Sequence, residues 1–336
     1  MKRPQTIDAQ AASCLNEASY NPRRLVLLHS GIALGLSLAL TVISFLLSRG
    51  IGETGGLSGI ATRSLLSTIQ TILQYASAIL LPFWQIGFVA AAMAIARKQP
   101  FGPQTLLRGF YRFGSVLGLM FTQALLIFAV AFVLIYACSS LYMMTPLAAP
   151  FIEIMEPVIQ NTSLLSGEQI YLDEATVAAV SQTLTPLIIF YAIVFLAVII
   201  PLSYRFRMAE FVLMDENRTS GLRAMVASAK LMRRNRLALF RLDLHFWWFY
   251  LLQGLAVVVG YGDSILPILG IDLTMNKDVA FFLFFILQLL GQFALHLWAK
   301  ARIQTSYALV YQELKTAAAE QVPPQPDPKK LPWTYE

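Results

Sequence analysis

The sequence predicts an all-α fold: a polytopic transmembrane helical bundle of six spans, with both termini on the cytoplasmic side. Of the 336 residues, 57% are hydrophobic and 13% are charged, whereas a soluble domain carries about 25% charged residues. Several apolar runs are long enough to cross about 30 Å of hydrocarbon as helices. Lys and Arg residues are concentrated in alternate connections, which indicates a defined topology.

Six apolar stretches qualify as spans because none has a charged residue in its central third, as a lipid-embedded helix requires. They are Leu25–Leu47, Thr71–Ile95, Gly114–Cys138, Ser181–Tyr204, Leu242–Gly260 and Val279–Ala299. The first exceeds the roughly 7–15 residue apolar core of a signal peptide, so we expect it to be retained. Residues 1–24 are then a cytoplasmic N-terminal segment, and residues 25–314 form the transmembrane domain.

The orientation follows from the Lys and Arg residues of the connections, because these residues resist translocation. Of the 25 in the chain, only Arg49, Arg63 and Lys277 fall on the predicted outer side. Both termini are therefore predicted to be cytoplasmic. The third connection is long and acidic, and we expect it to end in a helix that begins near Asp173 and continues into the fourth span.

An amphipathic cytoplasmic helix is predicted between spans 4 and 5, from a cap at Thr219 or Ser220 to about Arg234. Its apolar residues at helical spacing are Leu222, Met225, Val226, Ala229 and Met232. Its cations are Arg223, Lys230, Arg233 and Arg234. We interpret it as an interfacial basic helix near anionic headgroups. Packing beneath the bundle is the alternative.

Polar residues at membrane depth are the candidate functional positions. Gln85, Gln123, Gln253 and Gln288 fall near the midplane of their predicted spans, and Gln288, Gln292 and His296 form one stripe on the sixth. An unpaired amide is costly in hydrocarbon, so these side chains should face the bundle interior. Interhelical hydrogen bonding is the favoured interpretation, and a polar path for a substrate is the alternative. Gly31-x-x-x-Gly35 and Gly114-x-x-x-Gly118 suggest close helix packing.

The chain shows no phosphate-binding loop, H-E-x-x-H, C-x-x-C or G-x-S-x-G pattern. We therefore expect no enzymatic activity, no cofactor and no metal site; a site built from His29, His245 and His296 is geometrically conceivable but disfavoured. The basic residues lie between apolar runs and do not form one face, so nucleic acid is not expected as a partner. Residues 315–336 are predicted to be a disordered, proline-rich cytoplasmic tail, with protein docking as a second interpretation.

The chain resembles the DUF975 family of uncharacterised bacterial integral membrane proteins. The resemblance rests on the run Tyr204–Ala209, Leu213, Asp215, Ser228, Leu231, Met232, Asn235, Arg236, Leu239, Phe240, Leu242 and Leu244. It extends to Pro82, Gly87, Arg97, Lys98, Gly109, Phe110, Arg112, Phe113, Ala308, Val310, Tyr311, Glu313 and Leu314. It implies a multi-span protein of the bacterial inner membrane, and it implies no chemistry.

Three function classes remain open. The favoured one is a non-enzymatic protein of the cell envelope, whose partners are the lipid bilayer and another membrane or cytoplasmic protein or a second copy of itself. The alternative is a transporter or permease subunit for a small molecule or lipid. An enzyme would have to rely on Asp243 and His245, because no other cluster of catalytic residues is visible.

Overall fold

The computed structural model describes residues 2–53, 57–161, 174–216, 218–268 and 275–320, and all regular structure in these ranges is helical. The chain divides into two compact units. Unit 1 comprises Met1–Gly118 and Arg207–Glu336, and unit 2 comprises Leu119–Phe206. Each unit is described separately.

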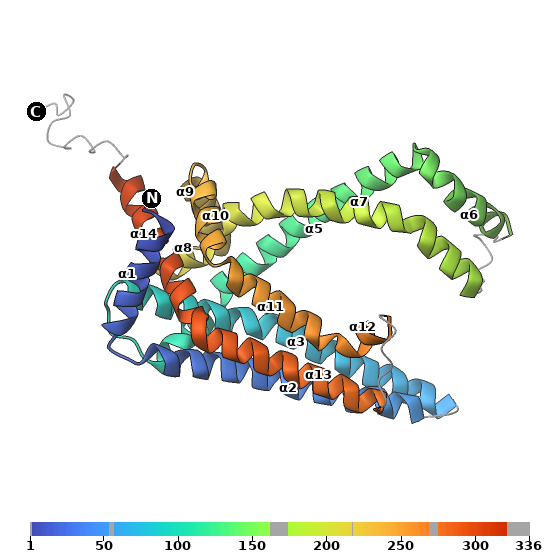
Figure 1. Ribbon diagram of the computed structural model, residues 1–336, viewed down its shortest axis with the longest axis horizontal. Helices are drawn as coiled ribbons and strands as arrows, with labels where there is room; N and C mark the ends of the chain where they lie inside the picture. The colour runs from blue at the N-terminus through green and yellow to red at the C-terminus, as the bar shows by residue number, and fades with distance from the viewer. Residues whose placement is uncertain (1, 54–56, 162–173, 217, 269–274, 321–336) are drawn as a thin grey trace, which may run out of the picture. The chain divides into compact units, whose positions relative to one another are not determined.

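In unit 1, helices α2, α3, α11 and α13 run side by side (Figure 1), with α2 against α3 and α13, and α13 against α11. Helix α14 packs on α1 and α3. The elements are α1 (Pro4–Asn16), α2 (Pro22–Glu53), α3 (Leu57–Ala96), η1 (Pro103–Leu107), α4 (Arg108–Tyr111), α8 (Ala209–Asp215), α9 (Gly221–Met232), α10 (Arg236–His245), α11 (Trp247–Gly260), α12 (Gly262–Ile268), α13 (Lys277–Leu295), the π-helical turn η3 (His296–Lys300) and α14 (Ala301–Glu320).

Unit 2 contains most of α5 (Phe113–Met143), then η2 (Pro146–Ala148), α6 (Ala149–Asn161) and α7 (Glu174–Phe206). The hydroxyl of Tyr142 lies 2.9 Å from the carbonyl oxygen of Leu147 and 2.8 Å from that of Thr183. One buried side chain thus joins α5, η2 and α7. The start of α7 at Glu174 confirms the helix expected to begin near Asp173.

Among the residues that the structure describes, five helical stretches are long and apolar enough to cross a membrane. They are Pro22–Leu47, Ser64–Ala96, Phe113–Met143, Ala179–Asp215 and Lys277–Glu320. In four of them at most 6% of the most apolar window is buried, so most of this apolar surface needs an apolar solvent. The chain is therefore a helical membrane protein. A sixth span exists only if α10 and α11, bent by 65° at Phe246, are taken together.

The predicted fifth span, Leu242–Gly260, falls on two helices. Residues up to His245 belong to α10 and α11 begins at Trp247, and the two are long and apolar enough for a span only when they are taken together. Asp243 accepts a hydrogen bond from Tyr307 of α14, and His245 lies 3.0 Å from Asp8 of α1. These polar contacts hold α10 against unit 1, and a hydropathy pattern cannot reveal them.

Both predicted terminal segments contain helix. Helix α14 continues to Glu320, so the tail does not begin at residue 315. The helix can continue this far because the first proline of the region is Pro323. The remaining tail, 321–336, lies outside the described residues. In the N-terminal segment α1 buries Ile7 and Ala11 and packs on α14, α3 and α10.

Helix α3 ends where its last carbonyls are satisfied by the following loop. The Gln99 N–H donates to Ala94 at 2.9 Å and the Lys98 N–H donates to Ile95 at 3.0 Å, the pattern of a Schellman motif. Lys98 occupies the left-handed position with φ 55°. Its side chain donates to Glu17 at 2.6 Å, which raises the pKa of Lys98 and links this turn to the end of α1.

Close backbone packing occurs at glycines other than those of the predicted motifs. A Cβ atom at Gly31, Gly35 or Gly114 would meet nothing within 4 Å, and one at Gly118 would lie 4.0 Å from the backbone nitrogen of Gly221, an ordinary van der Waals contact. At Gly87 of α3, by contrast, it would overlap the carbonyl of Leu106 in η1. Spacing alone does not identify a packing glycine, because only the tertiary structure supplies the second backbone.

The predicted helix between spans 4 and 5 is confirmed as α9, and Ser220 caps it by accepting from the Arg223 N–H at 3.5 Å. Its predicted apolar face is only partly buried. Met225 and Met232 are buried, whereas Leu222 and Val226 are 59% and 49% exposed. The packed face is instead completed by small residues, which let α9 approach α8 and α14.

Candidate functional site

A half-open cavity of about 290 Å³ lies within unit 1. Its walls come from α3, the turn between α7 and α8, α11, η3 and α14. The lining residues are Gln85, Arg207, Phe249, Tyr250, Gln253, His296, Lys300, Ile303, Gln304 and Tyr307. Most of them carry polar side chains, although the surrounding helices are strongly apolar. The cavity is therefore the candidate functional site.

Two cations line the cavity, from separate elements. The guanidinium of Arg207 lies 5.0 Å from the ring centroid of Tyr307 and donates to the Tyr307 hydroxyl at 3.4 Å. Lys300 lies 5.6 Å from the ring centroid of Phe88, and its Nζ is 3.3 Å from His29 Nδ1. Both charges rest on aromatic rings, which stabilise them without neutralising them.

No Asp or Glu lines the cavity in the described part of the chain. Asp243 accepts a hydrogen bond from Tyr307 behind the wall. Glu210 of α8 is within electrostatic range of Arg207 but does not line the cavity. The charged groups that face the cavity are thus cationic, and carboxylates partly balance them from outside.

A chain of hydroxyl groups connects the cavity to Asp243. Tyr250 Oη lies 2.8 Å from Tyr307 Oη, and the Tyr307 hydroxyl donates to Asp243. Because the Tyr307 proton is directed at Asp243, the Tyr250 hydroxyl donates to Tyr307. Tyr307 is buried, and this hydrogen-bonded chain joins two residues that line the cavity.

Three amides line the cavity without a protein partner. The side chains of Gln85, Gln253 and Gln304 make no hydrogen bond to any residue that the structure describes. A neutral amide supplies two donors and one acceptor oxygen. Their grouping beside Arg207 and Lys300 provides several donors that a bound ligand could use.

The π-helical turn η3 places two lining residues, His296 and Lys300, at its ends. π-turns are rare and are frequent at functional sites. His296 Nδ1 lies 3.4 Å from Ser30 Oγ on α2, so this turn is also tied to a neighbouring helix. No Pro or Gly within 296–300 signals the turn in the sequence.

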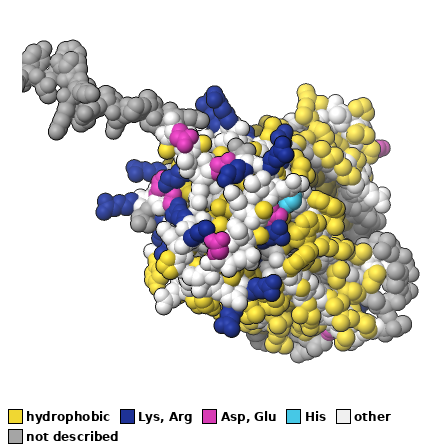
Figure 2. Space-filling model, turned by 60° about the vertical axis from the view of Figure 1, so that its left-hand side comes forward, with side chains coloured by type: hydrophobic (Ala, Val, Ile, Leu, Met, Phe, Trp, Pro, Cys, Tyr) yellow, Lys and Arg dark blue, Asp and Glu magenta, His cyan; other side chains and the backbone are white. Residues whose placement is uncertain are grey.

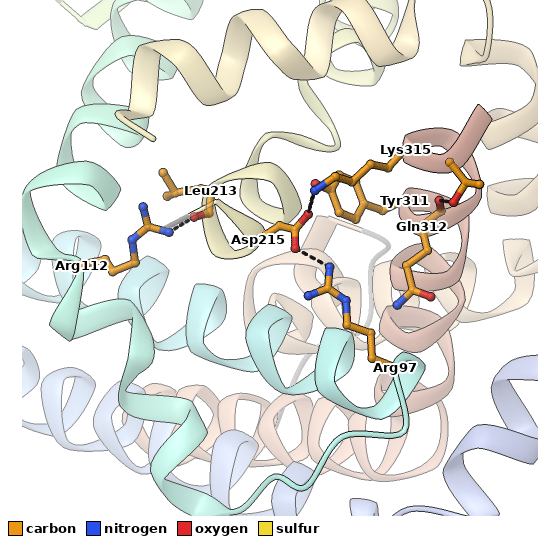
Figure 3. A network of polar contacts seen from close by, with 8 residues as sticks. Arg97, Arg112, Leu213, Asp215, Tyr311, Gln312 and Lys315 are labelled. Carbon is orange, nitrogen blue, oxygen red and sulfur yellow. Dashed lines mark hydrogen bonds and ion pairs between the residues drawn. The ribbon is translucent and has the colours of Figure 1, made fainter. Parts of the chain in front are cut away.

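An ion network connects several elements of unit 1 (Figure 3). Asp215, at the end of α8, forms ion pairs with Arg97 and Lys315 and accepts from the Tyr311 hydroxyl at 2.8 Å. Arg112 donates to the carbonyl of Leu213 in the same helix. The network thereby connects a residue that follows α3, a residue that precedes α5, and residues on α8 and α14.

The profile of the family described as "Protein of unknown function (DUF975)" matches residues 28–318. The chain belongs to the DUF975 family. No curated protein and no solved structure matches. The DUF975 region contains every cavity residue and the whole Asp215 network, whereas α1 precedes it. Several residues that carried the resemblance, among them Arg97, Asp215 and Tyr311, are members of that network.

The cavity includes part of the predicted set of polar residues. Gln85, Gln253 and His296 line it. Gln288 packs against Gly260 of α11, and Gln292 lies on α13 outside the lining. Gln123 lies in unit 2. The five glutamines make no side-chain hydrogen bond to another described residue. Their role, in interhelical hydrogen bonding or along a polar path, stays a prediction.

The remaining predicted positions lie elsewhere. Arg223, Lys230, Arg233 and Arg234 are exposed on or just after α9 and do not line the cavity. The three histidines have separate partners: Lys300 for His29, Asp8 for His245 and Ser30 for His296. No group of three metal-binding side chains occurs among the residues searched, which are those described.

Sequence reasoning missed Arg207, Lys300, Tyr250, Gln304 and Tyr307. The two cations lie at the ends of predicted spans, where positive charge has an ordinary topological explanation. Arg207 did fall in the run Tyr204–Ala209 that carried the resemblance, and that was the available signal.

Proposed function

We propose that this protein is a six-span protein of the cytoplasmic membrane, with both termini inside, that acts by binding and not by catalysis. Its ligand carries a carboxylate or phosphate group, either on a small molecule or on a lipid headgroup. The observation that carries the proposal is the pair of cations, Arg207 and Lys300, facing a cavity whose described lining includes no carboxylate.

The chemistry of the cavity suits one anionic group. Hydrogen bonds from Arg or Lys to a carboxylate or phosphate are about twice as strong as neutral ones. Free amides at Gln85, Gln253 and Gln304 add neutral donors around the same space. The volume of about 290 Å³ is near the lower end of the roughly 300–1,000 Å³ of typical ligand pockets. A single headgroup or small metabolite fits this size.

The arrangement of the candidate acid–base residues supports a non-enzymatic role. Asp243 is engaged by Tyr307, whereas His245 is engaged by Asp8, which also binds Arg302 at 2.7 Å. Asp243 and His245 therefore serve different contacts, and neither lines the cavity. A general acid or base must reach the proton it transfers.

Transport is the second candidate. The cavity is half-open and lies between α3, α11 and the long stretch Lys277–Glu320. Two of its amides, Gln85 and Gln304, are within helical stretches that are long and apolar enough to cross a membrane. Binding sites of secondary transporters lie between such helices, often beside an interrupted one, and η3 interrupts this stretch. A permease would use the same site, with a second conformation open to the other side.

Anion binding is expected to depend on both cations. Inorganic phosphate and a short-chain phosphatidylglycerol serve as probes, titrated separately into full-length protein in neutral detergent. Arg207→Gln and Lys300→Gln should each weaken binding about tenfold or more, since a hydrogen bond to a charged group contributes roughly 1.5–3 kcal/mol. Lys300→Arg should retain part of the affinity.

Arg108→Gln is the matched control, because Arg108 is an exposed cation outside the cavity. Binding of phosphate alone would favour a small-molecule ligand, and binding of the lipid alone would favour a headgroup. Unchanged affinity for both probes in folded Lys300→Gln protein would contradict the proposal.

The topology predicts which positions a membrane-impermeant maleimide reaches in intact cells. Cysteine at exposed Lys277 should be labelled from outside, and cysteine at exposed Glu320 only after the membrane is permeabilised. The native Cys14 and Cys138 are buried, so the unmodified chain gives the background. Labelling of Glu320→Cys in intact cells would refute a cytoplasmic C-terminus.

A further inference from the structure

The outer face of α9 carries exposed apolar residues next to exposed cations. Leu222 and Val226 are four residues apart, so they lie one above the other, and they are 59% and 49% exposed. Arg223 precedes Val226 by three residues and Lys230 follows it by four, so both lie beside this stripe, and both are exposed. Arg233 at the C-terminal cap is exposed as well. We call these five residues the α9 surface.

The opposite face of α9 packs on the protein. Met225 and Met232 are buried, and α9 contacts α8 and α14. The apolar face predicted from the sequence is therefore divided between two sides, because Leu222 and Val226 stay outside. Packing beneath the bundle and contact with another surface are thus compatible, since the helix has a separate face for each.

The cations of the α9 surface are not neutralised by nearby carboxylates. No Asp or Glu occurs in the sequence between Glu216 and Asp243. The side chains of Arg223, Lys230 and Arg233 form no ion pair with any residue that the structure describes. Figure 2 shows Lys and Arg side chains gathered on one part of the visible face, while hydrophobic side chains dominate another. A partner that fits the α9 surface must therefore supply both negative charge and apolar contact.

The chain holds α9 close to the ends of membrane-type helices. Helix α9 packs on α8, which ends the apolar stretch Ala179–Asp215. On its other side α10 begins at Arg236 and leads into the apolar helix α11. A helix attached in this way at both ends lies near the boundary between hydrocarbon and water. Amphipathic helices with Lys and Arg beside an apolar stripe bind at that boundary.

We propose that the α9 surface binds anionic phospholipid. Leu222 and Val226 enter the acyl region below the headgroups, and Arg223, Lys230 and Arg233 contact lipid phosphates. An acidic soluble protein would match the cations, but it would not supply the hydrocarbon that lies beside the end of a membrane-type stretch. None of the five residues lines the cavity, so this proposal does not depend on what the cavity binds.

The test measures the lipid composition next to α9. Full-length protein with a bimane label at Leu222→Cys is placed in phosphatidylcholine vesicles that contain spin-labelled phosphatidylglycerol or spin-labelled phosphatidylcholine as quencher. The phosphatidylglycerol should quench at about one tenth of the mole fraction or less, since one cation near an anionic surface contributes roughly a fivefold gain. The native Cys14 and Cys138 are buried, so the unmodified chain gives the background.

Two triple variants of the labelled protein separate the α9 surface from charge elsewhere. The first removes its three cations and should lose the preference for phosphatidylglycerol: Arg223→Gln/Lys230→Gln/Arg233→Gln. The second removes the same charge from exposed residues elsewhere and should keep the preference: Arg24→Gln/Arg108→Gln/Lys277→Gln. An equal preference in the two triple variants would overturn the proposal.

Aqueous iodide tests the depth of the label. A label at position 222 should be protected from iodide, whereas a label at Glu320→Cys, on the exposed last turn of α14, should be quenched. A label at position 222 that iodide quenches and spin-labelled lipid does not would contradict the proposal. Protection from both quenchers would also contradict it, in favour of a protein that covers α9.

Discussion

Asp215→Asn is expected to lower the free energy of unfolding by about 2–3 kcal/mol. The Asp215 side chain is 7% exposed and binds Arg97, Lys315 and Tyr311 together. Removing one partner of a buried ion pair costs roughly 3–5 kcal/mol, because the other charge stays uncompensated. Here the cost is smaller, since Arg97 and Lys315 are 31% and 51% exposed and recover some hydration.

The measurement is thermal unfolding in detergent, followed by size-exclusion chromatography with fluorescence detection. Lys98→Gln is the control, because the Lys98–Glu17 pair is also an ion pair but is exposed on both sides, at 62% and 56%. Water and salt screen such a pair, so its loss should leave the midpoint unchanged. Equal midpoints for Asp215→Asn and Lys98→Gln would show that the network does not stabilise unit 1.

Gly87→Ala is expected to destabilise the protein by about 3 kcal/mol. The added Cβ would overlap the carbonyl of Leu106 and lie 2.9 Å from its Cα. Overpacking costs roughly 1–3 kcal/mol, and the upper end applies because the obstacle is backbone that cannot rotate away. Helix α3 and η1 would have to separate, which would expose the fully buried Leu106.

Gly31→Ala is the matched control, since its Cβ would meet nothing within 4 Å. Alanine is a better helix former than glycine by about 0.5–1 kcal/mol, so this variant should unfold at the same temperature as the wild type or higher. The same detergent assay compares the two variants. A Gly87→Ala protein as stable as Gly31→Ala would mean that α3 and η1 are less closely packed than the structure shows.

The two glycine sets show what a spacing pattern can and cannot reveal. Gly31 and Gly35 satisfy the motif for close helix approach, yet neither meets another backbone in the described residues. Gly87 belongs to no Gly-x-x-x-Gly pair, but η1 crosses it directly. A motif records which surface could accept a neighbour, whereas the presence of the neighbour depends on residues about twenty positions away.

Helix ends could be predicted from the sequence where the residue that signals the end lies within one turn of it. Ser220 caps α9, and α7 begins beside the acidic pair Asp173 and Glu174, as predicted. Only some of the residues that line the cavity could be predicted from the sequence. Gln85, Gln253 and His296 stood out because polar groups are rare at membrane depth. Arg207 and Lys300 did not stand out, because a cation at the end of a span is expected.

The sequence by itself determined that the protein lies in a membrane, that its fold is helical, and to which family it belongs. Hydrophobicity and helix length are sums over local residues, so folding does not alter them. Only the tertiary structure decided where the polar groups meet. The break at Phe246, the π-turn at His296–Lys300 and the grouping of Arg207 with Lys300 all depend on contacts between segments distant in sequence. Such contacts follow from how the helices pack in three dimensions. Composition and periodicity do not encode that packing.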